Sequence, residues 1–546
     1  MRLIPLRLWA LAVLSGVLQV LPFPIAGPAP VWRTAFCWVA LLPLLGALFG
    51  KSKTGNTLSL RQGAALGYVC GFVWYMGNCY WIYQTMYLYG GLAKPVAAGI
   101  LVLFCLYLGL YHALFGVLAT AFRLRFGRQT ALLLVPFAWV AVELARARIT
   151  GLPWDLLGIA QVDNPLLTRL APVTGAYGLS FVIAAVNALW LVRVRVRERR
   201  FTRPALTLAG VVLVLGYLVF LGRIQNPQAS PATASATLVQ ENLEVGAANT
   251  GPQPTNQELL DSFSYLSRYP GNHLFLGTPE LAGTPAVVFE SRTGPTPTDL
   301  IVWPESPAPF QENDSPFRAA LSSLAIATNA PLIVGNTGVD RTSDNSRGFY
   351  LYNSASFITA RGEFAGRYDK MHLVPFGEYV PFHQLFFFAK SLLNEVGTFD
   401  SGTHRTVFST GGHGYGTFIC YESIFADEIR QFVQEGADVL VNTSNDGWYG
   451  DTSAPWQHLN MVRMRAIENH RWVLRATNTG VTAAINPYGR VTVAAPRHIR
   501  TSIRVRFGYE RELTFYTRHG DLFAYACALM TTLALAFSLR GRVAVN

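Results

Sequence analysis

Long apolar runs dominate the first 225 residues of the chain and recur once near its end. A helix needs roughly 20 mostly apolar residues to cross the hydrocarbon core of a bilayer. Eight runs approach that length, and they predict a multi-span α-helical membrane protein with eight transmembrane helices. The predicted spans are Pro5–Leu21, Ala35–Gly50, Gln62–Tyr83, Val96–Ala121, Leu132–Ala145, Leu170–Val192, Ala205–Leu221 and Leu522–Leu539.

Basic residues gather at the ends of the apolar runs, with six arginines between positions 193 and 203. If the N-terminus is cytoplasmic, the loops on the inner side hold most of the Lys and Arg, as the positive-inside rule requires. Both termini are then cytoplasmic, and the chain from about Arg223 to Asp521 lies outside the cytoplasm. This topology accounts for the net charge of +12 without a nucleic-acid partner. A cytoplasmic partner for the arginine cluster is the alternative.

A separate α/β domain is predicted between the last two spans. A stretch rich in proline and small residues, 226–236, is typical of a linker. Short β-rich runs then alternate with helical stretches, which indicates an α/β fold. We predict spans one to seven in 1–225, an extracytoplasmic domain in 237–510, and the eighth span with a short cytoplasmic tail in 520–546. The β-rich runs are Thr237–Val239, Leu300–Trp303, Pro331–Gly335, Ala355–Ile358, Gly416–Ile419, Val439–Asn442 and Val481–Ile485.

Three side chains of types that can take part in catalysis lie at or near the ends of strands in this domain. Glu305 follows the run that ends at Trp303, Lys370 lies in a polar segment, and Cys420 follows Ile419. Strand ends are where α/β folds build their sites. Cys420 is the only one of six cysteines outside the apolar runs, and no Cys/His pair has zinc-ligand spacing. A carboxylate, a lysine and a cysteine can act as base, oxyanion stabiliser and nucleophile.

Each of these residues also has a structural interpretation. Glu305 can be a carboxylate at a helix start, Lys370 can pair with Asp369 or Glu378 on a surface, and Cys420 can be a small apolar residue that ends a buried strand. Their occurrence together favours an enzyme with a cysteine nucleophile, which needs neither a metal nor a cofactor.

The motifs around these residues resemble those of a known superfamily. Trp-Pro-Glu305, the run Lys370–Glu378 and Cys420-Tyr-Glu422 are similar to the Glu, Lys and Cys motifs of the carbon–nitrogen hydrolase (nitrilase) superfamily. With eight spans around the domain, the whole chain resembles the apolipoprotein N-acyltransferase family, a membrane-embedded branch of that superfamily. Further matches to this family are Gly151–Trp154, Asn442–Trp448 and Arg475–Gly480.

The resemblance implies an αββα sandwich and a specific reaction. A fatty acyl chain would pass from the sn-1 position of phosphatidylethanolamine, through a Cys420 thioester, to the N-terminal amine of diacylglyceryl-cysteine, the last step of lipoprotein maturation. Glu305 would be the base, while Lys370 and the Tyr421 N–H would stabilise the oxyanion. Glu378 and Glu422 would position Lys370 and close the site. The protein would be a monomer in a bacterial inner membrane, with a periplasmic catalytic domain, a phospholipid donor and a diacylated apolipoprotein acceptor.

Two departures from the family pattern are visible. The family usually has Gln-Gly-Asn after the first strand and then a functional tryptophan, whereas this chain has Gln240-Glu241-Asn242 and no tryptophan between Trp190 and Trp303. The stretch 272–298 has the character of an insertion.

An aromatic segment, Phe382–Ala389, follows the Lys370 motif. We predict that Phe382, Phe386 and Phe387 form a lid that faces the outer leaflet, excludes water and guides acyl chains to Cys420. An ordinary buried helix is the alternative.

Two other functions are compatible with parts of the sequence. A membrane-anchored amidase or nitrilase would hydrolyse a small C–N bond with the same three residues, but it would not need so many spans. A transporter or scaffold with a degenerate domain would not need the intact Glu305, Lys370 and Cys420 set.

Overall fold

The computed structural model describes residues 4–51, 55–195, 216, 220, 229–246, 254–271, 297–305, 310–345, 347–375, 377–379 and 399–540. The chain divides into two compact units, which are described separately. Unit 1 comprises Met1–Tyr83, Pro95–Pro227 and Thr514–Asn546, and unit 2 comprises Gln84–Lys94 and Gln228–Leu513.

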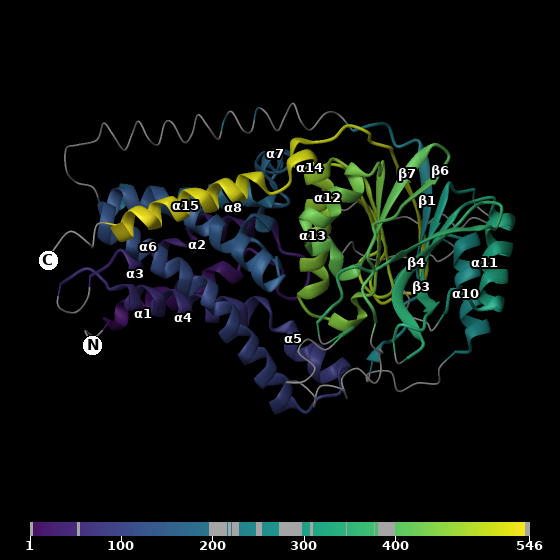
Figure 1. Cartoon of the computed structure of the whole chain (residues 1–546), viewed down its shortest axis with the longest axis horizontal. Helices are drawn as coiled ribbons and strands as arrows, with labels where there is room; N and C mark the ends of the chain where they lie inside the picture. Colours follow the sequence, from purple (N-terminus) through teal and green to yellow (C-terminus); the bar gives the residue numbers. More distant parts are fainter. Residues whose placement is uncertain are drawn as a thin grey trace. The chain divides into compact units, whose positions relative to one another are not determined.

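In the described part of unit 1, the elements of regular secondary structure are helices, joined by loops (Figure 1). The last helix, α15, lies alongside α8, where the rings of Phe181 and Phe523 meet edge to face. The helices of unit 1 are α1 (Leu6–Val20), η1 (Val31–Phe36), α2 (Cys37–Ala40), α3 (Leu42–Leu48), α4 (Leu60–Asn78), α5 (Trp81–Gln84), α6 (Lys94–Ala145), η3 (Arg146–Thr150), η4 (Leu157–Gln161), η5 (Leu167–Leu170), α7 (Ala171–Thr174), α8 (Ala176–Arg195), α14 (Phe515–His519) and α15 (Leu522–Arg540).

Three helices in the described part are long and apolar enough to cross a membrane, judged by length and composition. They are Val31–Leu48, Lys94–Thr150 and Leu522–Leu539, and two shorter apolar helices are Leu6–Val20 and Ala176–Leu191. The prediction of a helical membrane protein is thus supported, whereas eight separate spans are not established. The predicted seventh span, Ala205–Leu221, lies almost wholly outside the described residues.

The long helix α6 is interrupted at one residue. Gly127 has φ 76° and ψ 177°, a backbone conformation that cannot continue a helix. Without this break, 52 helical residues would extend for roughly 80 Å, far more than the ~30 Å core of a bilayer. Gly127 therefore divides α6 into two helices, and these two correspond to the predicted fourth and fifth spans.

Small residues allow α4 to approach α6 closely. Gly63, Gly67 and Gly71 recur at every fourth position on one face of α4. A Cβ atom at Gly67 would lie 2.1 Å from the carbonyl oxygen of His112, and a Cβ at Gly116 would lie 2.2 Å from that of Gly63. Small residues at this spacing are common where helices pack in lipid. Lipid tails are as apolar as the side chains, so burial of apolar surface contributes little there and close van der Waals packing of the helices contributes more.

Unit 2 contains two six-stranded sheets. The first has the strand order β12-β1-β2-β3-β4-β5, and the second has the order β11-β10-β9-β8-β7-β6. Strands β1, β2 and β3 are parallel, as are β7, β8 and β9. The strands are β1 (Ala234–Gln240), β2 (Leu300–Val302), β3 (Leu332–Arg341), β4 (Phe349–Ile358), β5 (Phe364–Asp369), β6 (Val407–Thr410), β7 (His413–Ile419), β8 (Val439–Ser444), β9 (Val473–Thr477), β10 (Ala483–Ile485), β11 (Val491–Ala494) and β12 (Thr501–Phe507). Strand β1 begins within the predicted linker 226–236.

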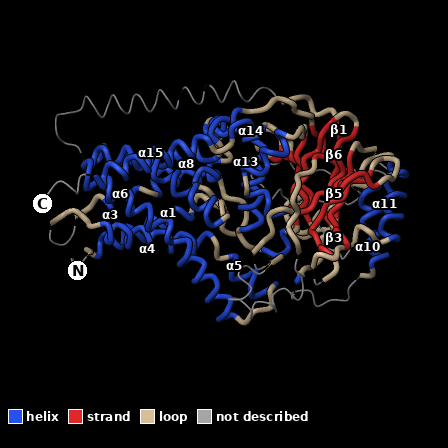
Figure 2. Tube along the Cα trace, viewed as in Figure 1, coloured by secondary structure: helices blue, strands red, loops and turns tan. Residues whose placement is uncertain are grey.

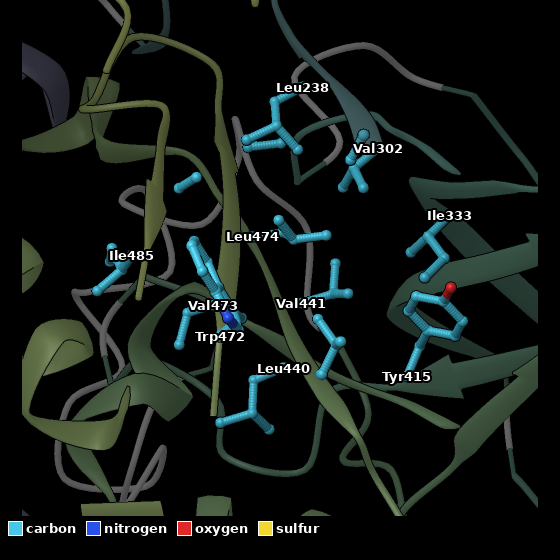
Figure 3. Packing of buried hydrophobic residues seen from close by; sticks show 14 of the residues in the cluster. Leu238, Val302, Ile333, Tyr415, Leu440, Val441, Trp472, Val473, Leu474 and Ile485 are labelled. Carbon is cyan, nitrogen blue, oxygen red and sulfur yellow. The ribbon is translucent and has the colours of Figure 1, made fainter. Parts of the chain in front are cut away.

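The two sheets pack face to face around an apolar core (Figure 3). Alternate residues of β2 point in opposite directions, so that Val302 joins this core, whereas Ile301 faces the helices on the outer side. Helices α10 (Asn256–Arg268) and α11 (Ser315–Thr328) cover the first sheet. Helices α12 (Ala426–Gln434) and α13 (Ala454–Asn469) pack against the second sheet (Figure 1). Figure 2 shows the strands in red with helices α10 and α11 on one side. This arrangement confirms the predicted αββα sandwich.

The segment Gln84–Lys94 belongs to unit 2, although the sequence places it between two predicted spans. This segment contains a π-helical turn, η2 (Thr85–Tyr89). It lies beside the 3₁₀ turn η9 (Asp446–Tyr449), which follows β8. A Cβ atom at Gly450 would lie 2.5 Å from the hydroxyl oxygen of Tyr89. Gly450 also has φ +56°, so both its conformation and its close contact with Tyr89 require glycine.

Candidate active site

The three candidate residues all lie at or just after the ends of strands. Lys370 directly follows β5, Cys420 directly follows β7, and Glu305 lies three residues beyond β2. Strands β2 and β5 belong to one sheet and β7 to the other, and the two sheets are packed face to face. The fold therefore gathers side chains that are 115 residues apart in the sequence, and all three are buried.

Two carboxylates converge on the ammonium group of Lys370. The Nζ atom of Lys370 is 3.1 Å from Oε1 of Glu305 and 2.9 Å from Oε1 of Glu378. The side-chain amide of Asn353 donates to the same two oxygens at 2.7 Å each. The second oxygen of Glu305 accepts from the backbone N–H of Asn445 at 2.8 Å, so Glu305 is held at both oxygens.

This arrangement keeps Lys370 positively charged. Burial on its own would lower the pKa of Lys370, but the charges of Glu305 and Glu378 outweigh burial and hold its pKa well above the ordinary range. A buried ammonium group flanked by carboxylates is a fixed positive charge in a poorly screened environment, which suits the stabilisation of a developing oxyanion.

Cys420 occupies an unusual backbone conformation at the end of β7. Its φ angle is +48°, in the left-handed region that residues with a Cβ atom rarely adopt. Strain of this kind clusters at functional sites. The short turn η8 (Cys420–Ile424) begins here, and Tyr421 and Glu422 lie in this turn.

The electrostatic environment keeps the Cys420 thiol protonated at rest. Burial raises the pKa of Cys420, the negative charge of Glu305 raises it further, and Lys370 lowers it only in part. A thiol in this state is a poor nucleophile until a base removes its proton. The buried, hydrogen-bonded carboxylate of Glu305 is suited to that role.

The raised pKa predicts how Cys420 reacts with iodoacetamide. Because the thiolate is the reactive form, the alkylation rate should show no titration midpoint between about pH 6 and pH 9, a range that includes the ordinary cysteine pKa of roughly 8.5. The Cys420→Ala protein, which retains the other five cysteines, supplies the background to subtract. A midpoint below about pH 9 would contradict the assigned environment.

Glu422 links the Lys370 segment to the Cys420 turn. Its Oε1 accepts from the Tyr368 hydroxyl and the Met371 N–H, both at 2.7 Å, and its Oε2 accepts from the Ile419 N–H at 2.7 Å. Burial raises the pKa of Glu422 to about 6, although these hydrogen bonds oppose the shift. Glu422 therefore braces the chain on both sides of the site, while Glu378 contacts Lys370 directly.

Several residues at the site were not singled out from the sequence. Asn353 lies in β4 (Phe349–Ile358), where its only sequence signal is a polar side chain inside a strand. Asn445 had a better signal, because it belongs to the motif Asn442–Trp448. The predicted lid residues Phe382, Phe386 and Phe387 lie outside the described residues, as does nearly all of the stretch 272–298.

Gln240 and Glu241 of the unusual Gln240-Glu241-Asn242 run are hydrogen-bonded to residues that are distant in sequence but close in space. The Gln240 amide donates to the carbonyls of Pro496 and Ile499 at 2.8 Å each. Glu241 is buried and accepts from Nε of Arg500 at 2.9 Å. Arg500 thus compensates the charge of the glutamate that stands where the family usually has glycine.

Comparison with known proteins gives matches along nearly the whole chain. Residues 277–505 match the carbon–nitrogen hydrolase family, and residues 15–189 match the apolipoprotein N-acyltransferase N-terminal domain. The apolipoprotein N-acyltransferase of Geobacter metallireducens is 34% identical over 98% of this chain and 96% of its own length. The protein of that name from Bordetella bronchiseptica is 32% identical, over 98% and 97% respectively.

The chain is also similar to solved structures of the nitrilase superfamily at low sequence identity. A Saccharomyces cerevisiae member of the nitrilase superfamily is 18% identical, covers 54% of this chain and 98% of its own, and has a TM-score of 0.36.

Proposed function

The chain belongs to the apolipoprotein N-acyltransferase family, and on this premise we propose that it transfers a fatty acyl chain from a phospholipid to the N-terminal amine of a lipoprotein. The proposed donor group is the sn-1 chain of phosphatidylethanolamine, and the acceptor is the amine of diacylglyceryl-cysteine. The observation that carries the proposal is the buried Glu305–Lys370 pair, whose charges act on the thiol of Cys420.

In the first half-reaction, the phospholipid acylates Cys420. Glu305 takes the thiol proton as Sγ attacks the ester carbonyl carbon, and the negative charge moves to the carbonyl oxygen. Lys370 and the backbone N–H of Tyr421 stabilise that oxyanion. The tetrahedral intermediate then collapses, the C–O bond breaks, and the leaving alkoxide takes the proton from Glu305. The products are a Cys420 thioester and a lysophospholipid.

In the second half-reaction, the lipoprotein amine attacks the thioester. Glu305 accepts a proton from the attacking nitrogen, the C–S bond breaks, and that proton returns to the Cys420 thiolate. The result is an amide at the lipoprotein N-terminus and a free enzyme. Because the first product leaves before the acceptor reacts, ping-pong kinetics are expected.

Unit 1 fits this chemistry as the membrane part of the enzyme. We propose eight spans, with α6 counted as two because of its break at Gly127, both termini in the cytoplasm, and the catalytic domain on the periplasmic side. This orientation follows the distribution of Lys and Arg and would bring the site to the outer leaflet. A single copy of the chain contains all the proposed catalytic residues, so we propose that the enzyme acts as a monomer.

A reconstituted transfer reaction tests the proposed function. The purified protein is mixed with phosphatidylethanolamine vesicles and a diacylated lipopeptide that carries a free N-terminal amine. We expect N-acylated peptide and lysophospholipid in equal amounts, and no acylated product from the same peptide with an acetylated N-terminus. Ammonia release from a small primary amide, without lysophospholipid formation, would instead support the membrane-anchored amidase.

The aromatic segment gives a separate prediction about lipid access. Replacing Phe386 and Phe387 by aspartate should raise the KM for phospholipid at least about tenfold, because burying a single aromatic ring contributes roughly 1.5–3 kcal/mol. The matched control is Phe349→Asp, since Phe349 is an exposed residue of β4. Unchanged lipid turnover in a folded double variant would rule out the lid.

A further inference from the structure

A second buried ionic cluster contacts the backbone carbonyl of Cys420 through His458. It consists of Asp446, His458 and Arg475, whose side chains have no solvent exposure. They come from η9, α13 and β9 respectively, so three separate elements hold the cluster. The proposed reaction assigns no role to these residues.

Asp446 is the centre of this cluster. Its Oδ2 accepts from Nη2 of Arg475 at 2.6 Å, and its Oδ1 lies 2.9 Å from Nδ1 of His458. The Ser444 hydroxyl donates to Oδ1 at 2.9 Å. Burial opposes ionisation of Asp446, but the charge of Arg475, together with that of His458, outweighs burial and holds the pKa of Asp446 below its ordinary range. Asp446 is therefore an anion, and its Oδ1, the nearer of two polar neighbours, favours a proton on Nδ1 of His458. The other neighbour is Nη2 of Arg475, at 3.2 Å.

The other ring nitrogen of His458 faces the nucleophile's own backbone. Its Nε2 is 3.1 Å from the carbonyl oxygen of Cys420 and 2.6 Å from the hydroxyl oxygen of Ser423. A backbone carbonyl can only accept a hydrogen bond. For the contact between Nε2 and this carbonyl to be a hydrogen bond, Nε2 must carry the proton. Without that proton, the nitrogen lone pair would face the carbonyl oxygen directly.

The bonded carbonyl belongs to the residue with the strained backbone. A φ of +48° at a non-glycine residue persists only where the surroundings fix it. The backbone of Cys420 sets the direction of its Cα–Cβ bond, and rotation about that bond then places Sγ in one of a few staggered positions. A bond that fixes the carbonyl therefore restricts where the thiol can lie relative to Glu305 and Lys370.

We propose that His458 is a positioning residue, which donates from Nε2 to the Cys420 carbonyl and, anchored by Asp446, holds the nucleophile in its reactive direction. It acts through Cys420 and does not touch the substrate. The inference rests on the proposed role of Cys420 as nucleophile and adds a residue that sets its geometry.

Two amide substitutions separate this role from a purely structural one. The amide nitrogen of His458→Gln can reach the position of Nε2 and bond the Cys420 carbonyl, whereas that of His458→Asn reaches the position of Nδ1 and bonds only Asp446. The measured quantity is the single-turnover rate of Cys420 acylation by phosphatidylethanolamine. At saturating lipid we expect the asparagine variant to be at least about 100-fold slower, because a misplacement of 1 Å can cost that much. The glutamine variant should stay within about tenfold of wild type, and the half-saturating lipid concentration should not change.

An asparagine variant that acylates as fast as the glutamine variant would overturn the role of His458. A second measurement, on the wild-type protein, avoids any dependence on the folding of variants. Solid-state NMR of protein labelled with ¹⁵N in histidine rings and ¹³C in cysteine carbonyls identifies the ring coupled to a cysteine carbonyl. A protonated Nε2 is expected there, and a bare nitrogen would refute the proposal. Acylation that persists in Cys420→Ala would instead refute the proposed nucleophile, so the two failures are distinguishable.

Discussion

Replacing Cys420 by alanine is expected to lower the rate of acyl transfer by at least about 10³-fold, because the covalent step loses its nucleophile. Lysophospholipid release should fall in parallel, since both products depend on the same thioester. Cys420→Ser should also be strongly impaired, because a hydroxyl is a weaker nucleophile than a thiol at neutral pH. The rates are measured in vesicles with phosphatidylethanolamine and a diacylated lipopeptide.

The matched control for this experiment is Cys527→Ala. Cys527 is also a buried free cysteine, but it lies in α15 of unit 1. The Cys527→Ala variant should retain activity, which would show that loss of a buried thiol does not by itself inactivate the enzyme. A Cys420→Ser variant that turned over at the wild-type rate would contradict the assignment of the nucleophile.

Replacing Lys370 by methionine is expected to reduce both activity and stability. The rate should fall by about 10²–10³-fold, the usual cost of losing one oxyanion-stabilising group. Methionine has a similar length, but it leaves the carboxylates of Glu305 and Glu378 buried without a countercharge. Removing one partner of a buried ion pair costs about 3–5 kcal/mol, so the thermal unfolding midpoint of the purified protein should fall clearly.

The double variant Lys370→Met/Glu378→Gln separates these two effects. It removes one of the two stranded charges, so it should regain part of the lost thermal stability. Its activity should remain low, because the ammonium group is still absent. Full activity in either variant would contradict the role of Lys370, and no gain in stability would contradict the electrostatic explanation.

Strands β2 and β7, which precede Glu305 and Cys420, could be predicted from sequence because they are short, apolar and followed by polar residues. Strand β5, which precedes Lys370, was not predicted, because its sequence includes the charged residues Arg367 and Asp369. Strand β9 (Val473–Thr477) escaped prediction, since it includes the buried Arg475, whose charge is paired with that of Asp446, 29 residues earlier in the chain. The placement of Gln84–Lys94 with unit 2 also depends on a tertiary contact, between Tyr89 and the Gly450 region. No local pattern encodes such contacts.

In the candidate site, too, residues with a local sequence signal could be predicted, whereas a residue placed by tertiary contacts could not. Glu305, Lys370 and Cys420 each lie at or just beyond a strand end, and the resemblance to a known superfamily grouped them. Asn353 could not be placed with them, because its position depends on the pairing of β4 with β5. In that register the Lys370 N–H donates to the Asn353 carbonyl at 2.9 Å, which brings the two side chains together.

Intact-protein mass spectrometry tests the central claim most directly. The wild-type protein and Cys420→Ala are each incubated with phosphatidylethanolamine of defined acyl composition, without an acceptor. We predict that wild-type protein gains the mass of one sn-1 acyl chain, mapped to Cys420 by peptide analysis, and loses it when the diacylated lipopeptide is added. An equal acyl adduct on Cys420→Ala, or an adduct on the wild type that the lipopeptide does not discharge, would contradict the account.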